Sequence, residues 1–247
     1  MKDPALEVRD VKRAFGGLRA VDGVSFDVGR NKITTVIGPN GAGKSTLFNL
    51  ISGALRPDSG TVKLAGKDVT GMSPALLQNA GIARSFQITN VFFDLTVAEN
   101  IRLAAQLLEP KAAMIRSVAG SRRVLEKVEE ILARFNLQKK ENELAGNLSH
   151  GEQRRLEMAI CLASEPEVLM MDEPTQGMSH GDTEETAELI RELSRSVTVL
   201  LIEHDINLVM KLSSHIVVMH QGRKLAEGSP AQVRDNPSVQ AAYFGQH

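Results

Sequence analysis

The sequence predicts an α/β fold with a mainly parallel sheet, a small antiparallel β layer near the N-terminus and a small helical lobe. The β-branched segment 32–37 precedes a glycine-rich stretch and a helical pattern at 46–51. After Ser149, helix and strand patterns alternate, at 151–163, 168–171, 182–193 and 197–202. Such alternation is typical of parallel strands covered by helices. Alternating apolar and polar residues predict the antiparallel layer, at 6–11, 24–28 and 61–64.

The middle of the chain predicts the helical lobe. Apolar residues recur there at helical spacing, namely Val124, Leu125, Val128, Ile131, Leu132 and Phe135. The same stripe also fits ordinary core packing. We expect all 247 residues to form one domain, with a core of 1–88 and 165–247 and a helical lobe of 89–164.

Composition excludes several classes of protein. The apolar runs, such as 197–202, have the length of strands and not the about 18 residues of a membrane span. The N-terminus lacks an apolar signal region, and Cys161 alone cannot form an internal disulfide, so a reducing cytoplasm is expected. The net charge is −1, with no Trp and one Tyr, which argues against a nucleic-acid surface.

The run GPNGAGKST, residues 38–46, fits the pattern G-x-x-x-x-G-K-S/T between a strand and a helix. Its members are Gly38, Pro39, Asn40, Gly41, Ala42, Gly43, Lys44, Ser45 and Thr46. Unsatisfied backbone N–H groups, a helix N-terminus and the Lys44 ammonium together favour a bound phosphate. The pattern predicts a P-loop NTPase that binds a nucleoside triphosphate, with Ser45 as a Mg²⁺ ligand. The alternative is a glycine-rich turn with a solvent-facing lysine.

Two further strand ends carry polar side chains. Asp172 and Glu173 follow an apolar strand, and Glu203 and His204 follow the next. Because ligands sit beyond the carboxyl ends of parallel strands, we expect Asp172 to hold Mg²⁺ through water and Glu173 to activate the attacking water. The alternative is two surface acids that close a strand. His204 is either a γ-phosphate donor or a core histidine.

Two segments carry a helix-start signal. Ser149 and Glu152 form a capping box at the start of an apolar-faced helix, and Ser179 with Asp182 repeats the pattern. The exposed N–H groups after Ser149 serve either as a helix start alone or as a phosphate site.

Five motifs occur in the order and spacing found in an ATP-binding cassette ATPase, which the chain resembles over nearly its whole length. They are GPNGAGKST, Phe86-Gln87, LSHGEQRRLEMA, VLMMDEPTQG and IEHD. The resemblance implies that two cassettes close head to tail on two ATP molecules, so that a second ATP-binding subunit, identical or homologous, is expected.

The resemblance also assigns roles to individual residues. It implies that Phe15 stacks on adenine, that Lys44 and Ser45 hold the phosphates and Mg²⁺, and that Gln87 contacts Mg²⁺ and the attacking water. Glu173 would be the catalytic base and His204 the switch histidine. The signature motif would face the partner's γ-phosphate through Ser149 and Gly151, with His150 and Glu152 between and beside them.

A finer resemblance is to the ATPase subunits of importers for branched-chain amino acids and related compounds. RAFGGLRAVDGVSF, GIARSFQITNVFFDLTVAENI and GEQRRLEMA carry it. It implies integral-membrane permease subunits, a periplasmic or extracellular solute-binding protein and a place at the cytoplasmic face of the inner membrane. The cargo stays open, because similar relatives serve urea, amides or aromatic acids. The alternatives are a lipid or lipopolysaccharide exporter ATPase and a cassette ATPase that acts on nucleic acid.

Two parts of the chain depart from the usual pattern of the family, and one apolar segment has two possible roles. His150 and Glu152 stand where the signature usually reads LSGGQ, which alters its bulk and charge. Ser179 stands where many cassettes carry an aspartate, so the resemblance gives no residue for the cross-dimer role of that aspartate. Val91, Phe92, Phe93 and Leu95 are expected either to contact a permease helix or to pack inside the helical lobe.

Overall fold

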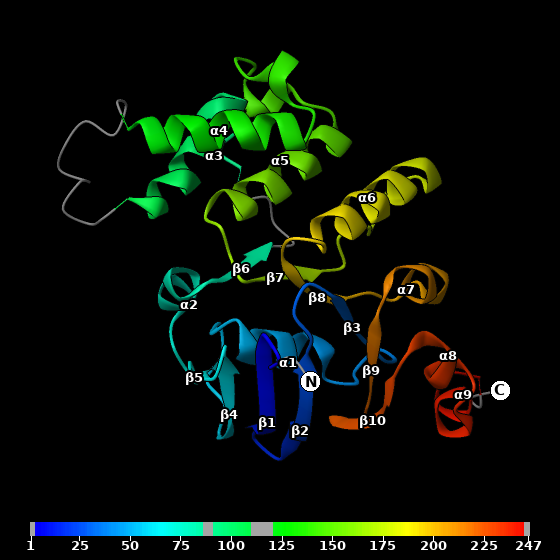
Figure 1. The fold of residues 1–247 in the computed structure, drawn as a ribbon. Coiled ribbons are helices and arrows are strands. Elements are labelled where there is room, and N and C mark those ends of the chain that lie inside the picture. The colour runs from blue at the N-terminus through cyan, green and yellow to red at the C-terminus, as the bar shows by residue number, and fades with distance from the viewer. Residues whose placement is uncertain (1–2, 86–90, 110–120, 245–247) are drawn as a thin grey trace. The chain divides into compact units, whose positions relative to one another are not determined.

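A computed structural model gives the fold and describes residues 3–85, 91–109 and 121–244. The chain divides into two compact units (Figure 1). Unit 1 comprises Met1–Ile82 and Glu167–His247, and unit 2 comprises Ala83–Pro166.

The larger sheet of unit 1 has the strand order β10-β9-β3-β8-β7. Its strands are β3 (Ile33–Ile37), β7 (Val168–Asp172), β8 (Thr198–Ile202), β9 (His215–His220) and β10 (Arg223–Gly228). All neighbours are parallel except β10, which pairs antiparallel with β9. The predicted parallel sheet is therefore confirmed, and the carboxyl ends of β3, β7 and β8 lie at one edge.

The second sheet of unit 1 is antiparallel, in the order β2-β1-β4-β5. Its strands are β1 (Leu6–Phe15), β2 (Leu18–Val28), β4 (Ser59–Leu64) and β5 (Lys67–Asp68). This confirms the predicted β layer, but β1 runs beyond the predicted 6–11. The register shifts between Val8 and Val11, and Asp10 has a φ of 47°. Such an irregularity breaks the alternation on which the sequence prediction depended.

Helix α1 (Lys44–Ile51) fills the main core of unit 1. Its Leu47, Phe48, Leu50 and Ile51 are buried and share one cluster with apolar residues of both sheets, such as Val62 and Leu200. Burial of each such side chain contributes about 1.5–3 kcal/mol. The glycine-rich stretch is thus fixed between a buried strand and a buried helix. Unit 1 also contains the helices α2 (Pro74–Ala80) and α6 (His180–Leu193).

The C-terminal elements were not predicted from the sequence. Helices α7 (Ile206–Leu212), α8 (Pro230–Arg234) and α9 (Pro237–Phe244) contribute to a second core cluster with β9. Figure 1 shows α8 and α9 beside β9 and β10.

Unit 2 is built on α3 (Val97–Ala105), α4 (Arg122–Arg134) and α5 (His150–Ala163), which pack on one another. Strand β6 (Ile82–Ser85) leads into it, and the short helix η1 (Gln106–Leu108) follows α3. Thr96 and Glu99 cap α3 reciprocally. The predicted stripe on α4 is buried except for Leu125, which is exposed.

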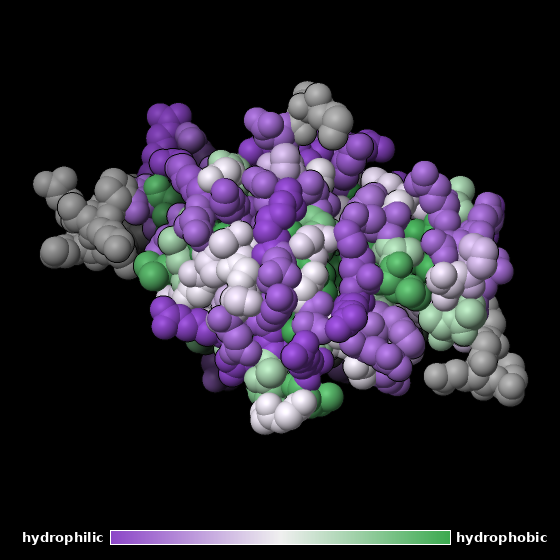
Figure 2. All heavy atoms as spheres, turned by 90° about the horizontal axis from the view of Figure 1, so that it is seen from below, coloured by the Kyte–Doolittle hydropathy of each residue, from purple (hydrophilic) through white to green (hydrophobic). Residues whose placement is uncertain are grey.

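Hydrophilic side chains cover most of the face shown in Figure 2, and apolar atoms form small separate groups there. None of the helices within residues 3–85, 91–109 and 121–244 has the length and apolar character needed to cross a bilayer.

Candidate nucleotide-binding site

The loop Gly38–Gly43 joins β3 to α1 at the carboxyl edge of the larger sheet. Gly41 and Gly43 have φ values of 78° and 96°, which favour glycine. A Cβ on Gly43 would come within 2.2 Å of the carbonyl oxygen of Ala20, so a side chain is excluded there by contact as well. Helix α1 begins at Lys44, two residues before the predicted start, and its first N–H groups follow directly on the loop.

Lys44 lies inside this loop. It is 8% exposed, and its Nζ donates hydrogen bonds to the carbonyl oxygens of Gly38 at 2.8 Å and Pro39 at 3.1 Å. Burial lowers the pKa of the Lys44 ammonium, while the charges of Glu173 and Asp172 oppose that shift. The alternative of a solvent-facing lysine is therefore wrong. A phosphate placed at the loop would offer the Lys44 ammonium a charged acceptor in place of these neutral carbonyl oxygens.

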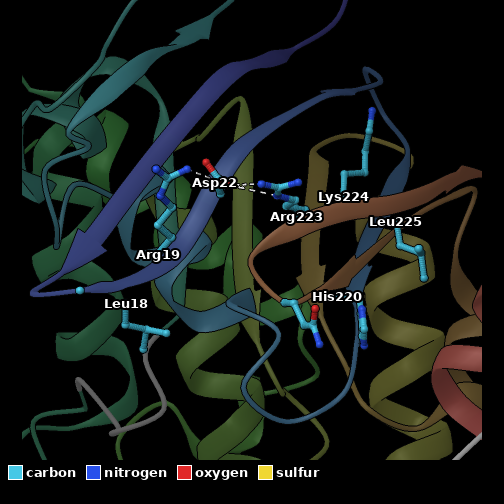
Figure 3. A pocket seen from close by; sticks show the side chains of 9 residues that line it. Leu18, Arg19, Asp22, His220, Arg223, Lys224 and Leu225 are labelled. Atoms are coloured by element: carbon cyan, nitrogen blue, oxygen red, sulfur yellow. Dashed lines mark hydrogen bonds and ion pairs between the residues drawn. The ribbon is translucent and has the colours of Figure 1, made fainter.

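The turn between β9 and β10 connects the loop to strand β2. Gly222 N donates to the Ala42 carbonyl at 3.0 Å, and Asp22 N donates to the Gly222 carbonyl at 2.8 Å. Figure 3 shows Asp22 between Arg19 and Arg223, at the side of a hollow of about 630 Å³. Hydrogen bonds from Arg223 lower the pKa of the Asp22 carboxyl. The Asp22–Arg223 ion pair links β2 to the start of β10, next to the turn that hydrogen-bonds to the loop.

The predicted carboxylates lie at the same edge. Asp172 ends β7, is buried, and pairs in register with Ile202 at the end of β8. Glu173 follows with a φ of 48°, a conformation that is costly for a residue with a Cβ. Its N–H donates to the Ile202 carbonyl at 2.9 Å. Strained backbone of this kind is concentrated at functional sites.

His204 follows β8 by two residues and faces Glu173. Its side chain is 57% exposed, so the alternative of a core histidine is wrong. Its Nδ1 lies 3.8 Å from Glu173 Oε1 and 3.8 Å from Glu203 Oε2. Sequence reasoning gave Glu203 no role, and it did not single out Thr175, which hydrogen-bonds to Glu203. The available signal was a carboxylate placed directly after the apolar run 199–202 of β8.

Two other predicted contacts have different outcomes. Phe15, the last residue of β1, is 45% exposed, and the Arg13 guanidinium lies 5.0 Å from its ring centroid. One aromatic face is thus already stacked on a cation. Gln87 lies outside the described residues.

The oxygen ligands near the loop suit a cation that takes few ligands from the protein. Within the described part of the chain, no group of three or more His, Cys, Asp or Glu side chains could hold a metal ion. Asp172 supplies one buried carboxylate, and Ser45 supplies a hydroxyl in the first turn of α1. Mg²⁺ is usually held by one or two protein ligands together with substrate phosphates and water, so these residues fit it.

The signature segment belongs to unit 2, and its capping box is confirmed. The Ser149 side chain accepts a hydrogen bond from Glu152 N, and Glu152 Oε2 accepts from Ser149 N and Oγ, both at 2.9 Å. Lys140 Nζ lies 3.2 Å from Glu152 Oε1. The Ser149 N–H is the main cause that lowers the pKa of Glu152. The extra acid is thus offset by a neighbouring lysine, and His150 beside it is exposed.

The expectations for Ser179 and for the apolar segment at 91–93 have different outcomes. Ser179 caps α6 and donates to Asp182 Oδ2 at 2.7 Å, as the helix-start pattern predicted. Val91 is buried, so core packing applies to it, whereas Phe92 is 60% and Phe93 is 44% exposed.

Comparisons with known proteins agree with this geometry. The family described as ABC transporter matches residues 21–176, and the family described as branched-chain amino acid ATP-binding cassette transporter matches residues 223–247. The chain is 40% identical over 254 residues to the high-affinity branched-chain amino acid transport ATP-binding protein BraF of Pseudomonas aeruginosa, with 100% of both chains covered. It is 39% identical over 255 residues to LivG of Escherichia coli, which has the same description, again with 100% of both covered.

Solved structures show the same likeness. The crystal structure of a nucleotide-free ATP-binding cassette from an ABC transporter has a TM-score of 0.85 and 32% identity, with 99% of this chain and 100% of that chain covered. The ADP conformation of an ATP-binding cassette gives the same values. The chain therefore belongs to the ABC transporter family, as an ATP-binding cassette ATPase that is coupled to transport.

Proposed function

We propose that this ATPase drives an importer of branched-chain amino acids, or of related small amino acids and amides. The observation that carries the proposal is the 40% identity along the whole chain to a relative whose name states that cargo. The match at residues 223–247 supports the same subfamily, since the description of the matched family also names branched-chain amino acids. It includes β10, α8 and α9.

ATP would be held by the loop 38–46 and by Phe15. The Lys44 ammonium now bonds to two backbone carbonyls, and a phosphate oxygen is a stronger, charged acceptor for the same donor. The first N–H groups of α1 face the same loop and add the positive end of a helix. Phe15 would offer adenine the ring face that Arg13 leaves uncovered.

Mg²⁺ would be held by Ser45, Asp172 and Gln87, and it would supply positive charge to the β- and γ-phosphate oxygens. Asp172 supports this proposal because it is a buried carboxylate at the end of β7, at the same edge of the sheet as the loop. The assignment of Gln87 rests on the resemblance of its motif alone.

Glu173 would accept a proton from the attacking water, and His204 would donate to the γ-phosphate. The 3.8 Å separation of their side chains supports a shared task, because both groups then reach one small region. A positioned general base typically contributes about 10²–10⁴-fold in rate.

A second ATP-binding subunit would complete each site. We propose that 89–164 acts as a helical lobe whose signature residues, Ser149, His150, Gly151 and Glu152, face the γ-phosphate held by that subunit. The N-terminus of the 14-residue helix α5 supports this, since its positive end attracts an anion. The Lys140 contact would limit the repulsion between Glu152 and the phosphate.

The remaining partners are membrane permease subunits and, through them, a periplasmic or extracellular solute-binding protein. We place the chain at the cytoplasmic face of the inner membrane. A nucleic-acid partner is not expected, because the net charge is −1 and gives no basic field.

The test is reconstitution in liposomes of this chain with the permease and solute-binding proteins encoded beside it. ATP-driven uptake of labelled leucine, isoleucine or valine is expected. Uptake of urea or an aromatic acid without any of these three would contradict the cargo assignment. Failure of the chain to hydrolyse ATP in this complex would contradict its role as the ATPase.

A further inference from the structure

Glu203 is a fully buried carboxylate that contacts His204, one of the residues proposed to act on ATP. It is 0% exposed and follows β8 directly, between Ile202 and His204. Burying a carboxylate is costly unless hydrogen bonds satisfy it. The hydrogen-bond partners of Glu203 therefore indicate the function of this buried carboxylate.

The two oxygens of Glu203 hold two different loops. Oε1 accepts hydrogen bonds from Thr175 Oγ1 at 2.6 Å and from Thr175 N at 3.3 Å. Oε2 accepts one from His204 N at 3.1 Å and lies 3.8 Å from His204 Nδ1. The carboxylate thus links the turn after β7 to the loop after β8.

Thr175 belongs to the turn that begins at Glu173. In that turn Gln176 N donates to the Glu173 carbonyl at 3.1 Å, and Met178 N donates to the Thr175 carbonyl at 3.2 Å. Glu173 itself has a φ of 48°, which persists only where the surroundings hold it. By fixing Thr175, Glu203 restrains this turn two residues from the strained position.

We infer that Glu203 is a positioning residue for ATP hydrolysis. It holds Glu173 and His204 in their positions relative to each other, through Thr175 and the His204 backbone. The inference rests on the roles proposed above for Glu173 and His204. Glu203 itself touches neither ATP nor water in this scheme.

A carboxylate is needed because both neighbours present backbone N–H groups. Thr175 N donates to one oxygen and His204 N to the other. The amide of glutamine has one acceptor and one donor end, so whichever way it turns, its NH₂ faces one of these N–H groups. Glu203→Gln keeps the size of the side chain but loses the acceptor for one of the two backbone N–H groups.

The experiment measures steady-state ATP hydrolysis by the complex with its permease, for Glu203→Gln, Thr175→Val, Thr175→Ser and the double variant Thr175→Val with Glu203→Gln. For Glu203→Gln we expect kcat to fall roughly 10- to 100-fold, because misplacing reacting groups has effects of this size. The KM for ATP should stay within about twofold, since the loop 38–46 is untouched.

The threonine variants test the link and do not depend on the folding of Glu203→Gln. Thr175→Val removes the 2.6 Å hydrogen bond and should lower kcat, whereas Thr175→Ser keeps the hydroxyl and should regain most of that loss. The double variant should lose little more than Glu203→Gln alone, because the two residues share one interaction.

Two results would overturn the inference. One is an unchanged kcat in both Glu203→Gln and Thr175→Val. The other is a loss of kcat that Thr175→Ser fails to recover while KM rises in parallel, which would indicate general distortion of the site. If the unsubstituted complex does not hydrolyse ATP at all, the proposed function fails, and with it the task assigned to Glu203.

Discussion

Nδ1 of His204 lies 3.8 Å from Oε1 of Glu173, although the two residues are separated by β8 and α6 in the chain. The contact exists because β7 and β8 are parallel neighbours that end in register, with Asp172 opposite Ile202. A strand pairing thus brings together the two side chains that we propose to act on the γ-phosphate.

Lys44→Ala is expected to weaken ATP binding. The change removes a charged hydrogen-bond donor of a class that contributes about 1.5–3 kcal/mol, which corresponds to a 10- to 100-fold loss of affinity. Isothermal titration with ATP and Mg²⁺ measures it. Lys32→Ala is the control, because Lys32 is exposed and lies just before β3, away from the loop, so this variant should bind ATP normally. Equal affinities for all three proteins would contradict the site.

Phe92→Ser is expected to reduce recovery of the chain with its permease while ATP hydrolysis by the isolated chain persists. Phe92 is exposed, and its N–H and carbonyl are held by Asn100, so the side chain projects from a fixed backbone. Co-purification with tagged permease measures the effect. Leu125→Ser, an exposed apolar residue on α4, serves as the control. Loss of folding in Phe92→Ser would show instead that the side chain belongs to the core.

Glu152→Gln is expected to flatten the dependence of stability on pH. The pKa of Glu152 is lowered from 4.5 by the Ser149 N–H, the Ser149 hydroxyl and Lys140. The carboxylate therefore contributes stability above pH 4.5, and this contribution is lost as the pH falls through the lower folded pKa. At neutral pH the cost should stay below about 1 kcal/mol, because glutamine also completes a capping box.

Urea unfolding between neutral and acidic pH measures this difference. Glu143→Gln is the control, since Glu143 also pairs with Lys140, at 3.3 Å, but does not belong to the capping box of α5. Parallel curves for Glu152→Gln and the unsubstituted chain would show that the cap does not stabilise the charged form.

The sequence predicted elements with local causes and missed those with distant ones. Helices α5 and α6 start where Ser149 and Ser179 predicted, because a cap depends on residues three positions apart. Strands β9 and β10 were missed, because β9 depends in part on its pairing with β3, which is far away in the chain, and β10 in turn pairs with β9. The polar residues at the ends of both strands also weaken the apolar pattern that predicts a strand.

The same distinction applies to the site. The positions of Lys44, Asp172 and Glu173 follow from a loop and a strand end, both visible in the sequence. The bond from Thr175 to Glu203 spans 28 positions, and the positive φ of Glu173 leaves no local pattern. Both depend on how two loops meet after folding. The roles of Gln87 and of the signature residues stay predictions.

Asp172→Asn is expected to behave differently from substitution of its neighbour. Loss of the buried charge should weaken Mg²⁺-dependent binding of ATP and leave the chain monomeric, because Mg²⁺ prefers charged oxygen ligands. Titration of ATP with and without Mg²⁺ measures the change. An unchanged Mg²⁺ requirement would remove Asp172 from the metal site.

The role of Glu173 is tested most sharply by Glu173→Gln in ATP and Mg²⁺. Light scattering after size exclusion measures its dimerisation, and phosphate release with the permease present measures its hydrolysis. We expect a stable dimer with bound ATP and hydrolysis slowed about 10²–10⁴-fold, because only the base is lost. Hydrolysis at the unsubstituted rate would contradict the assignment of Glu173 as the catalytic base.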